Sequence, residues 1–137
     1  MDHLSPKERS EIMARVRSRD TRPEMVVRRL IFSLGYRYRL HAKDLPGRPD
    51  LVFRNRRKVI FVHGCFWHRH HNCALSRLPK SRQEFWIPKL KGNKERDDKN
   101  LGELRRRGWG VMTLWECQLS KPERLAGRIR RFLDAQR

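Results

Sequence analysis

The stretch from Val59 to Cys73, VIFVHGCFWHRHHNC, constrains the fold of this chain more than any other part of its sequence. It begins with consecutive apolar residues rich in valine and isoleucine, which predict a buried strand. It ends in four histidines, two cysteines and two adjacent aromatic residues. A strand that leads directly into metal ligands and proton-transfer groups indicates a functional site built at the edge of a sheet.

The composition indicates a polyanionic partner. The 137 residues fit one domain, and 34 Lys and Arg against 15 Asp and Glu give a formal net charge of +19. Basic residues recur along the whole chain and form no single block, so the charge belongs to the folded surface. Nucleic acid is the first candidate, because Lys and Arg that bind phosphates release condensed counterions. An anionic membrane surface is the second.

The sequence also limits where the protein acts and how its cysteines are used. No stretch approaches the roughly 20 apolar residues of a transmembrane helix, and the N-terminus lacks the apolar core of a signal peptide. We therefore expect a cytoplasmic protein that does not enter membranes. Three cysteines, an odd number, argue against a disulfide framework and favour metal ligation or simple burial.

Two helices are expected before the first strand. Ser5-Pro6-Lys7-Glu8 has the form of a capping box and predicts a helix over about 5–17. That helix is either docked on the core or an arm that lies along DNA. Thr21 and Glu24 form the capping pattern of a second helix, which Gly35 ends. The capping pattern alone would explain a glutamate at position 24, without any catalytic role.

The remaining pattern predicts an α/β fold. Strands are expected over 36–41, 50–53, 58–62 and 109–114, a long helix over 83–106 with an interruption near Pro88 or Gly92, and a final helix over 122–132. This order implies a central mixed sheet with helices on its faces. The tryptophans outside the stretch, Trp86, Trp109 and Trp115, are assigned to the core.

A Pro-Asp pair at positions 49 and 50 precedes one strand, and about a dozen residues later the neighbouring strand ends in Phe61-Val62-His63. This layout resembles that of the restriction-endonuclease-like nucleases. In such a site the Asp50 carboxylate would hold a divalent ion that activates water and neutralises charge on a phosphate. A Pro-Asp pair is also ordinary turn chemistry, so it does not establish catalysis by itself.

The cysteines indicate a second metal site. Cys65, His70 and Cys73 follow one another closely, and Cys117 comes at the end of a later strand. One imidazole and three thiolates form a normal closed tetrahedral zinc set, which would be structural. Three buried thiols are the alternative, and His71 competes with His70 as the fourth ligand.

Five motifs in order resemble the very-short-patch-repair (Vsr) mismatch endonucleases, over a region from about Met13 to Cys117. They are GRPD at 47–50, HGCFWH at 63–68, EFW at 84–86, ERD at 95–97 and WEC at 115–117. The resemblance implies a restriction-endonuclease-like fold and a structural zinc. It also implies magnesium-dependent nicking on the 5′ side of the thymine in T:G mismatches, which arise from deamination of 5-methylcytosine.

The resemblance further implies roles for the catalytic residues. Asp50 would bind the magnesium together with the main-chain carbonyl of Val62, a position at which well-studied relatives have threonine. His68 would move the proton that activates the attacking water, and His63 and Glu24 would support it. Asp97 would join the same hydrogen-bond network, with a solvated helix carboxylate as the alternative.

The remaining implications concern DNA and partners. Phe66 and Trp67 would enter the duplex beside the mismatch, and Met13 would enter from the other groove. The expected partner is double-stranded DNA with a T:G mismatch, and the family also suggests a mismatch-repair protein and a DNA polymerase. A monomer is expected, because one nick needs one active site. A zinc-stabilised DNA-binding protein without catalysis, or a nuclease for other damaged or branched DNA, are the alternatives.

Overall fold

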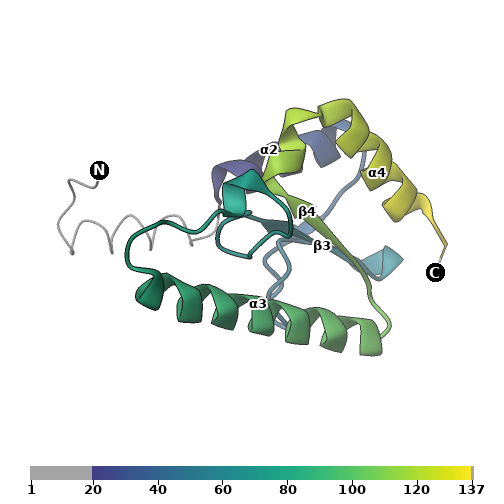
Figure 1. Cartoon of the computed structure of the whole chain (residues 1–137). Coiled ribbons are helices and arrows are strands. Elements are labelled where there is room, and N and C mark those ends of the chain that lie inside the picture. Colours follow the sequence, from purple (N-terminus) through teal and green to yellow (C-terminus); the bar gives the residue numbers. More distant parts are fainter. Residues whose placement is uncertain (1–19, 137) are drawn as a thin grey trace.

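The computed structural model of the chain describes residues 20–136, which form three helices and one four-stranded sheet (Figure 1). The helices are α2 (Arg22–Ser33), α3 (Gln83–Arg106) and α4 (Pro122–Asp134). The strands are β1 (Arg39–Leu40), β2 (Leu51–Phe53), β3 (Lys58–His63) and β4 (Gly110–Trp115). The helix expected over about 5–17, with Met13, lies outside the described residues.

The sheet is mixed, as the sequence predicts, with strand order β1-β2-β3-β4. β1 pairs with β2 and β2 with β3 in antiparallel fashion, whereas β3 and β4 are parallel. A parallel pair needs a crossover connection, and α3 supplies it. The register of the parallel pair begins with Lys58 opposite Gly110 and ends with His63 opposite Trp115.

Helices cover both faces of the sheet. Figure 1 shows α2 and α4 together on one face and α3 on the other. Side chains alternate along β3, so Ile60 packs toward α2 and α4, whereas Val59 and Phe61 pack with Leu104 of α3. By the same alternation His63 follows Phe61 onto the α3 face, and their ring centroids lie 5.6 Å apart. The core therefore brings the end of β3 next to α3.

Two elements differ from their predicted extent. The strand expected over 36–41 is reduced to Arg39–Leu40, because Tyr36 and Tyr38 pack against the core and His41 has a left-handed backbone with φ of 48°. The expected interruption in the long helix is wrong, since α3 runs unbroken through Pro88 and Gly92. Pro88 removes only one backbone donor in a helix of 24 residues, and the turns on both sides keep theirs.

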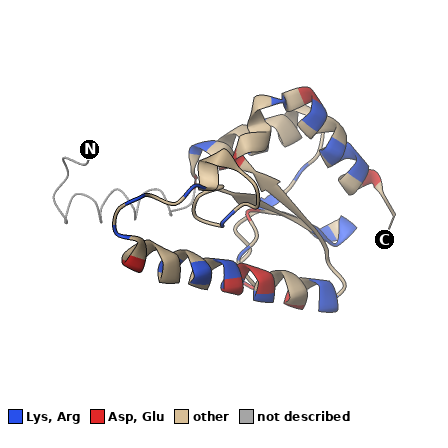
Figure 2. Cartoon of the chain, in the orientation of Figure 1, with Lys and Arg blue, Asp and Glu red and all other residues tan. Residues whose placement is uncertain are grey.

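The surface is basic, as the composition requires. Figure 2 shows Lys and Arg along α3 and α4, with acidic residues gathered mainly in the middle of α3. Among residues 20–136, no helix is both long and apolar enough to cross a membrane.

Candidate active site and metal centre

A cavity of about 490 Å³ lies where α2, the end of β3 and α3 meet. It collects side chains from parts of the sequence that are far apart. Its lining includes all five predicted catalytic residues, the predicted carbonyl position and both predicted wedge aromatics: Glu24, Asp50, Val62, His63, Phe66, Trp67, His68 and Asp97. Arg48, Asn93 and Asn100 also line it, and sequence reasoning did not select them.

The Asp50 carboxylate is held by the hairpin that follows it. Asp50 stands immediately before β2, and the antiparallel pairing of β2 with β3 brings it beside Val62. The Val62 N–H donates to Asp50 Oδ2 over 2.7 Å. Burial raises the pKa of Asp50 above its ordinary value, while this hydrogen bond and the nearby His41, His68 and Arg28 oppose the rise. A cation at this carboxylate would favour its ionised form.

The loop before Asp50 is shaped by Gly47. Its φ is +75°, in the left-handed region that favours glycine. A Cβ at this position would stand 3.1 Å from Asn100 Cβ and 3.2 Å from the Phe61 ring. The GRPD loop therefore lies directly against α3 and β3, which sets the position of Asp50 three residues later.

A histidine pair and an aspartate form the α3 side of the cavity. His68 Nδ1 lies 2.5 Å from Asp97 Oδ2, so α3 orients the ring of His68. The His63 ring stacks on the His68 ring with centroids 3.8 Å apart and planes within 6°. Burial, followed by the neighbouring His68, lowers the pKa of His63 to about 3, so His63 is neutral at neutral pH. Asp97 is therefore a hydrogen-bonded partner of His68 in this structure.

Glu24 has more partners than capping requires. Its N–H meets Thr21 Oγ1 at 3.4 Å, as the capping pattern predicts. Its carboxylate is buried, however, and pairs with the guanidinium of Arg28 and with His41 Nε2, the latter over 2.7 Å. Sequence reasoning missed Arg28 and His41. The spacing of four residues between Glu24 and Arg28 on one helix was a usable signal for the first pair.

The two predicted wedge residues belong to a larger aromatic cluster. Phe66 and Trp67 meet edge to face with centroids 5.1 Å apart, and Trp86 of α3 lies 5.2 Å from Phe66 and 5.8 Å from Trp67. Trp86 is half-buried and lies outside both core clusters, so its assignment to the core is wrong. Asn93 fastens the same loop through a 3.3 Å hydrogen bond from its amide to the Trp67 carbonyl.

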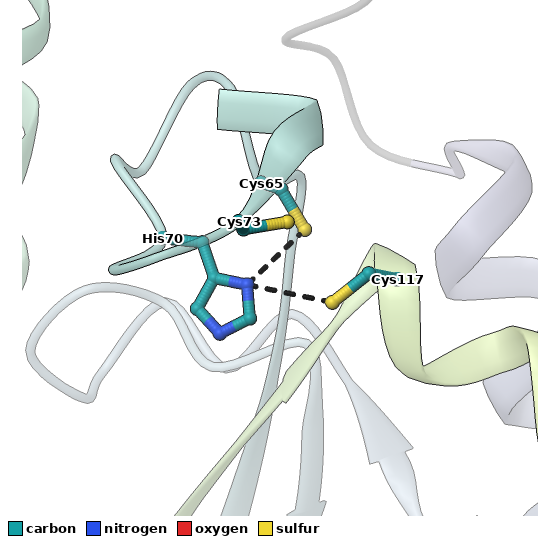
Figure 3. Close-up of side chains that lie close together, drawn as sticks. All are labelled: Cys65, His70, Cys73 and Cys117. Atoms are coloured by element: carbon teal, nitrogen blue, oxygen red, sulfur yellow. Dashed lines mark hydrogen bonds between the residues drawn. The ribbon is translucent and has the colours of Figure 1, made fainter. Parts of the chain in front are cut away.

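The predicted zinc ligands converge at one point beyond the strand ends (Figure 3). One ligand atom from each of Cys65, His70, Cys73 and Cys117 lies within 4.8 Å of all the others. His70 Nδ1 is 3.5 Å from Cys65 Sγ and 3.4 Å from Cys117 Sγ. The sulfur-to-nitrogen edge of a tetrahedral zinc site is about 3.6 Å, so this spacing fits one ion. His71 is exposed and does not join the cluster.

Neighbouring groups hold this cluster in shape. The ring of His70 stacks on Trp115 with centroids 4.1 Å apart and planes within 6°. Trp115 is half-buried and serves this contact, so it is not a core residue as predicted, whereas Trp109 is. The buried Ser76 hydroxyl shares its one proton between the carbonyls of His70 and Cys73, 2.7 and 2.8 Å away. Burial raises the pKa of Cys65, so a bound cation would be needed to hold its thiolate.

The comparisons with known proteins agree with this geometry. Residues 1–75 match the protein family described as DNA mismatch endonuclease Vsr. A type II nicking enzyme, V.XorIIP of Xanthomonas oryzae pv. oryzae, is 52% identical over 133 residues, which are 97% of this chain and 97% of the relative. This chain belongs to the Vsr family. The DNA mismatch endonuclease Vsr of Escherichia coli is 44% identical over 117 residues, 85% of this chain and 74% of that protein.

The Vsr family match and the individual relatives cover different parts of the site. The family match ends at residue 75 and so includes Asp50, His68 and three of the four converging cysteine and histidine ligands. Asp97 and Cys117 lie beyond it. A second nicking enzyme, V.NmeAIP of Neisseria meningitidis serogroup A, is 40% identical over 138 residues and spans 98% of both chains. Likeness to this nicking enzyme therefore extends over both halves of the cavity.

Proposed function

We propose that this Vsr protein nicks one strand of double-stranded DNA on the 5′ side of the thymine in a T:G mismatch, by magnesium-dependent hydrolysis. The chain is an endodeoxyribonuclease, as its family and its nicking relatives support. One observation carries the finer proposal: a single cavity holds the half-buried Asp50 carboxylate, a histidine oriented by an aspartate, and a pair of aromatic residues. A DNA-binding protein without catalysis would need neither this carboxylate nor the oriented histidine.

The residues present fit two kinds of metal ion. Asp50 and the Val62 carbonyl offer hard oxygen donors, which magnesium prefers. Bound there, magnesium would supply a Lewis acid beside the scissile phosphate. Cys65, His70, Cys73 and Cys117 offer three sulfurs and one nitrogen, the donor set of a structural zinc. Such a zinc would join the loop that carries His68 to the end of β4. The Val62 side chain packs against the core cluster that α2 and α4 share with the sheet.

The proton-moving group is His68. Its Nδ1 faces the Asp97 carboxylate, so the ring carries its proton on Nδ1 and leaves Nε2 as an acceptor. A water molecule in the cavity would give its proton to Nε2 as its oxygen attacks the phosphorus, and the Asp97 carboxylate would stabilise the imidazolium that results. The P–O ester bond on the opposite side of the phosphorus would break, and the released sugar oxygen would take up a proton from solvent. His63, stacked on His68 and neutral, keeps the ring from turning without adding a second positive charge.

Mismatch selection falls to the aromatic cluster, in which Phe66 and Trp67 line the cavity. Phe66 and Trp67 would enter the stack of bases, and Trp86 would support them from α3. Opening a base step costs a few kcal/mol, and a mismatched step costs less than a matched one. The wedge would therefore favour T:G over C:G before any base is read by hydrogen bonds.

The decisive experiment is strand-specific nicking of end-labelled duplexes that differ in one base pair, T:G or C:G, with and without magnesium. Asp50→Asn keeps the size of the side chain and removes its charge, so it should abolish nicking and leave DNA binding nearly unchanged. Asp98→Asn is the matched control, because Asp98 is an exposed carboxylate on α3 that pairs with Lys94. Undiminished nicking by Asp50→Asn, or equal nicking of both duplexes, would defeat the proposal.

A further inference from the structure

Three side chains at the α2 side of the cavity could hold a metal ion. One ligand atom each from Asp20, Glu24 and His41 lies within 4.8 Å of the others. Arg28 already reaches all three through a single nitrogen. Its Nη2 lies 2.5 Å from Asp20 Oδ1, in short contact with Glu24 Oε2, and 3.3 Å from His41 Nε2. The guanidinium nitrogen therefore lies at the centre of the ligand set, where a divalent ion would lie.

We propose that Arg28 is a built-in cation that fills a divalent-ion site formed by Asp20, Glu24 and His41, and that it positions Glu24 for the nicking reaction. The proposal rests on the proposed function for its catalytic part only. Arg28 is a positioning residue, because it does not line the cavity and acts through Glu24, which does.

Burial explains why a cation is needed there. The Glu24 side chain is only 4% exposed, and the side chains of Arg28 and His41 are 11% and 13% exposed. Glu24 and Asp50 line the same cavity, and two carboxylates in one site repel each other unless a positive charge lies close to one of them. Arginine keeps its charge at every physiological pH, whereas histidine does not. Arg28 therefore supplies a positive charge directly beside the buried Glu24 carboxylate.

The way Arg28 uses its donors favours this role over plain structural pairing. Arginine carries five N–H donors in a fixed fork, which can serve several acceptors at once. Within the described part of the chain, Arg28 Nε is buried and has no hydrogen-bond partner, and Nη1 meets only the Met25 sulfur, 3.2 Å away, while Nη2 meets three potential ligands. The oxygen and nitrogen ligands therefore converge on one atom, which is the pattern of ligands around an ion.

The first test counts Mn²⁺ ions bound to the zinc-loaded protein by electron paramagnetic resonance. Arg28→Ala opens the space and should bind one Mn²⁺ more per chain than the wild type. Adding Glu24→Gln to that variant should remove the extra ion. Arg29→Ala removes an exposed arginine from the same helix and should leave the count unchanged. An unchanged count in Arg28→Ala overturns the proposal.

A second variant keeps the test decisive if Arg28→Ala does not fold. Asp20 is 63% exposed, so Asp20→Asn should fold as the wild type does. Because the guanidinium fills the site, this variant should bind as many Mn²⁺ ions as the wild type. Loss of an ion in Asp20→Asn would mean that the wild-type group already holds a metal, and the proposal would be wrong.

The rate of nicking tests whether Arg28 positions Glu24 for the reaction. Arg28→Met, which fills the space without charge, should slow nicking about tenfold, less than the 10²–10³ seen when a group that contacts the transition state is removed. Arg28→Lys should recover part of the rate, and Arg28→Ala should recover as magnesium is raised. Equal rates in all variants at every magnesium concentration would overturn the positioning role. If the wild type itself does not nick, the proposed function fails, and the ion counts still decide whether Arg28 fills a cation site.

Discussion

Gly47→Ala should weaken both the fold and nicking, because Gly47 shapes the loop that carries Asp50. Its φ of +75° costs an L-residue about 1–2 kcal/mol. The new Cβ would also press on Asn100 and Phe61, at 3.1 and 3.2 Å, so both neighbours must move by a few tenths of an ångström. We expect a total loss of about 2 kcal/mol. For a chain of 137 residues this lowers the melting temperature by about 7 °C.

The same displacement of the loop should also slow the nicking reaction. Asp50 stands three residues after Gly47, and misplacing a reacting group by 1 Å can cost about 10²-fold in rate. A shift of a few tenths of an ångström should therefore slow single-turnover nicking of a T:G duplex by about tenfold, in excess magnesium and below the melting transition. DNA binding, measured on the same duplex, should change little.

Gly102→Ala is the matched control. Gly102 lies within α3, and the nearest atom to an added Cβ is the flexible end of Arg106, 3.5 Å away. Alanine there should raise the stability by about 0.5–1 kcal/mol and leave nicking unchanged. If Gly47→Ala melts and nicks like the wild type, the inference that this glycine positions Asp50 is refuted.

Two further predictions test the converging cysteines and the aromatic cluster. Cys117→Ser should lose stoichiometric zinc in elemental analysis and should melt about 10 °C or more below the parent. The reason is that a structural metal contributes its binding free energy to folding. A variant that keeps both its zinc and its stability would show that the four residues are not a metal site. The double change of Phe66→Ala and Trp67→Ala should reduce the preference for T:G over C:G more than it reduces nonspecific binding, whereas Phe32→Ala, at a 54% exposed position on α2, should change neither. Equal losses on both duplexes would count against the wedge.

Local pattern was enough to predict the strands and ligands near the centre of the sequence. The apolar run before His63, rich in valine and isoleucine, favours a buried strand, and the cysteines and histidines that follow it lie close together in the sequence. The proposed zinc ligands Cys65, His70 and Cys73 share one loop, so their convergence needed little tertiary information. Cys117 was also predictable, because parallel strands end at the same edge of a sheet.

Other features depend on tertiary contacts between distant parts of the chain, which a local sequence pattern does not report. The roles of Arg28 and His41 come from how α2 meets the turn after β1, which no periodicity reports. Trp86 and Trp115 read as core residues because half-buried and buried tryptophans have the same sequence context. Pro88 read as a break, but a long helix packed against a sheet tolerates the loss of one hydrogen bond.

The parallel pairing of β3 with β4 gives the cysteine cluster a consequence for how the chain matures. His63 lies opposite Trp115, and Cys65 and Cys117 each stand two residues beyond that pair. A slip of one residue would carry Cys117 about 3.3 Å along the strand and out of reach of a shared ion. During synthesis three ligands emerge before α3, and the fourth arrives only with β4. A metal ion held by all four residues would therefore stabilise only those chains in which β3 and β4 have paired in this register.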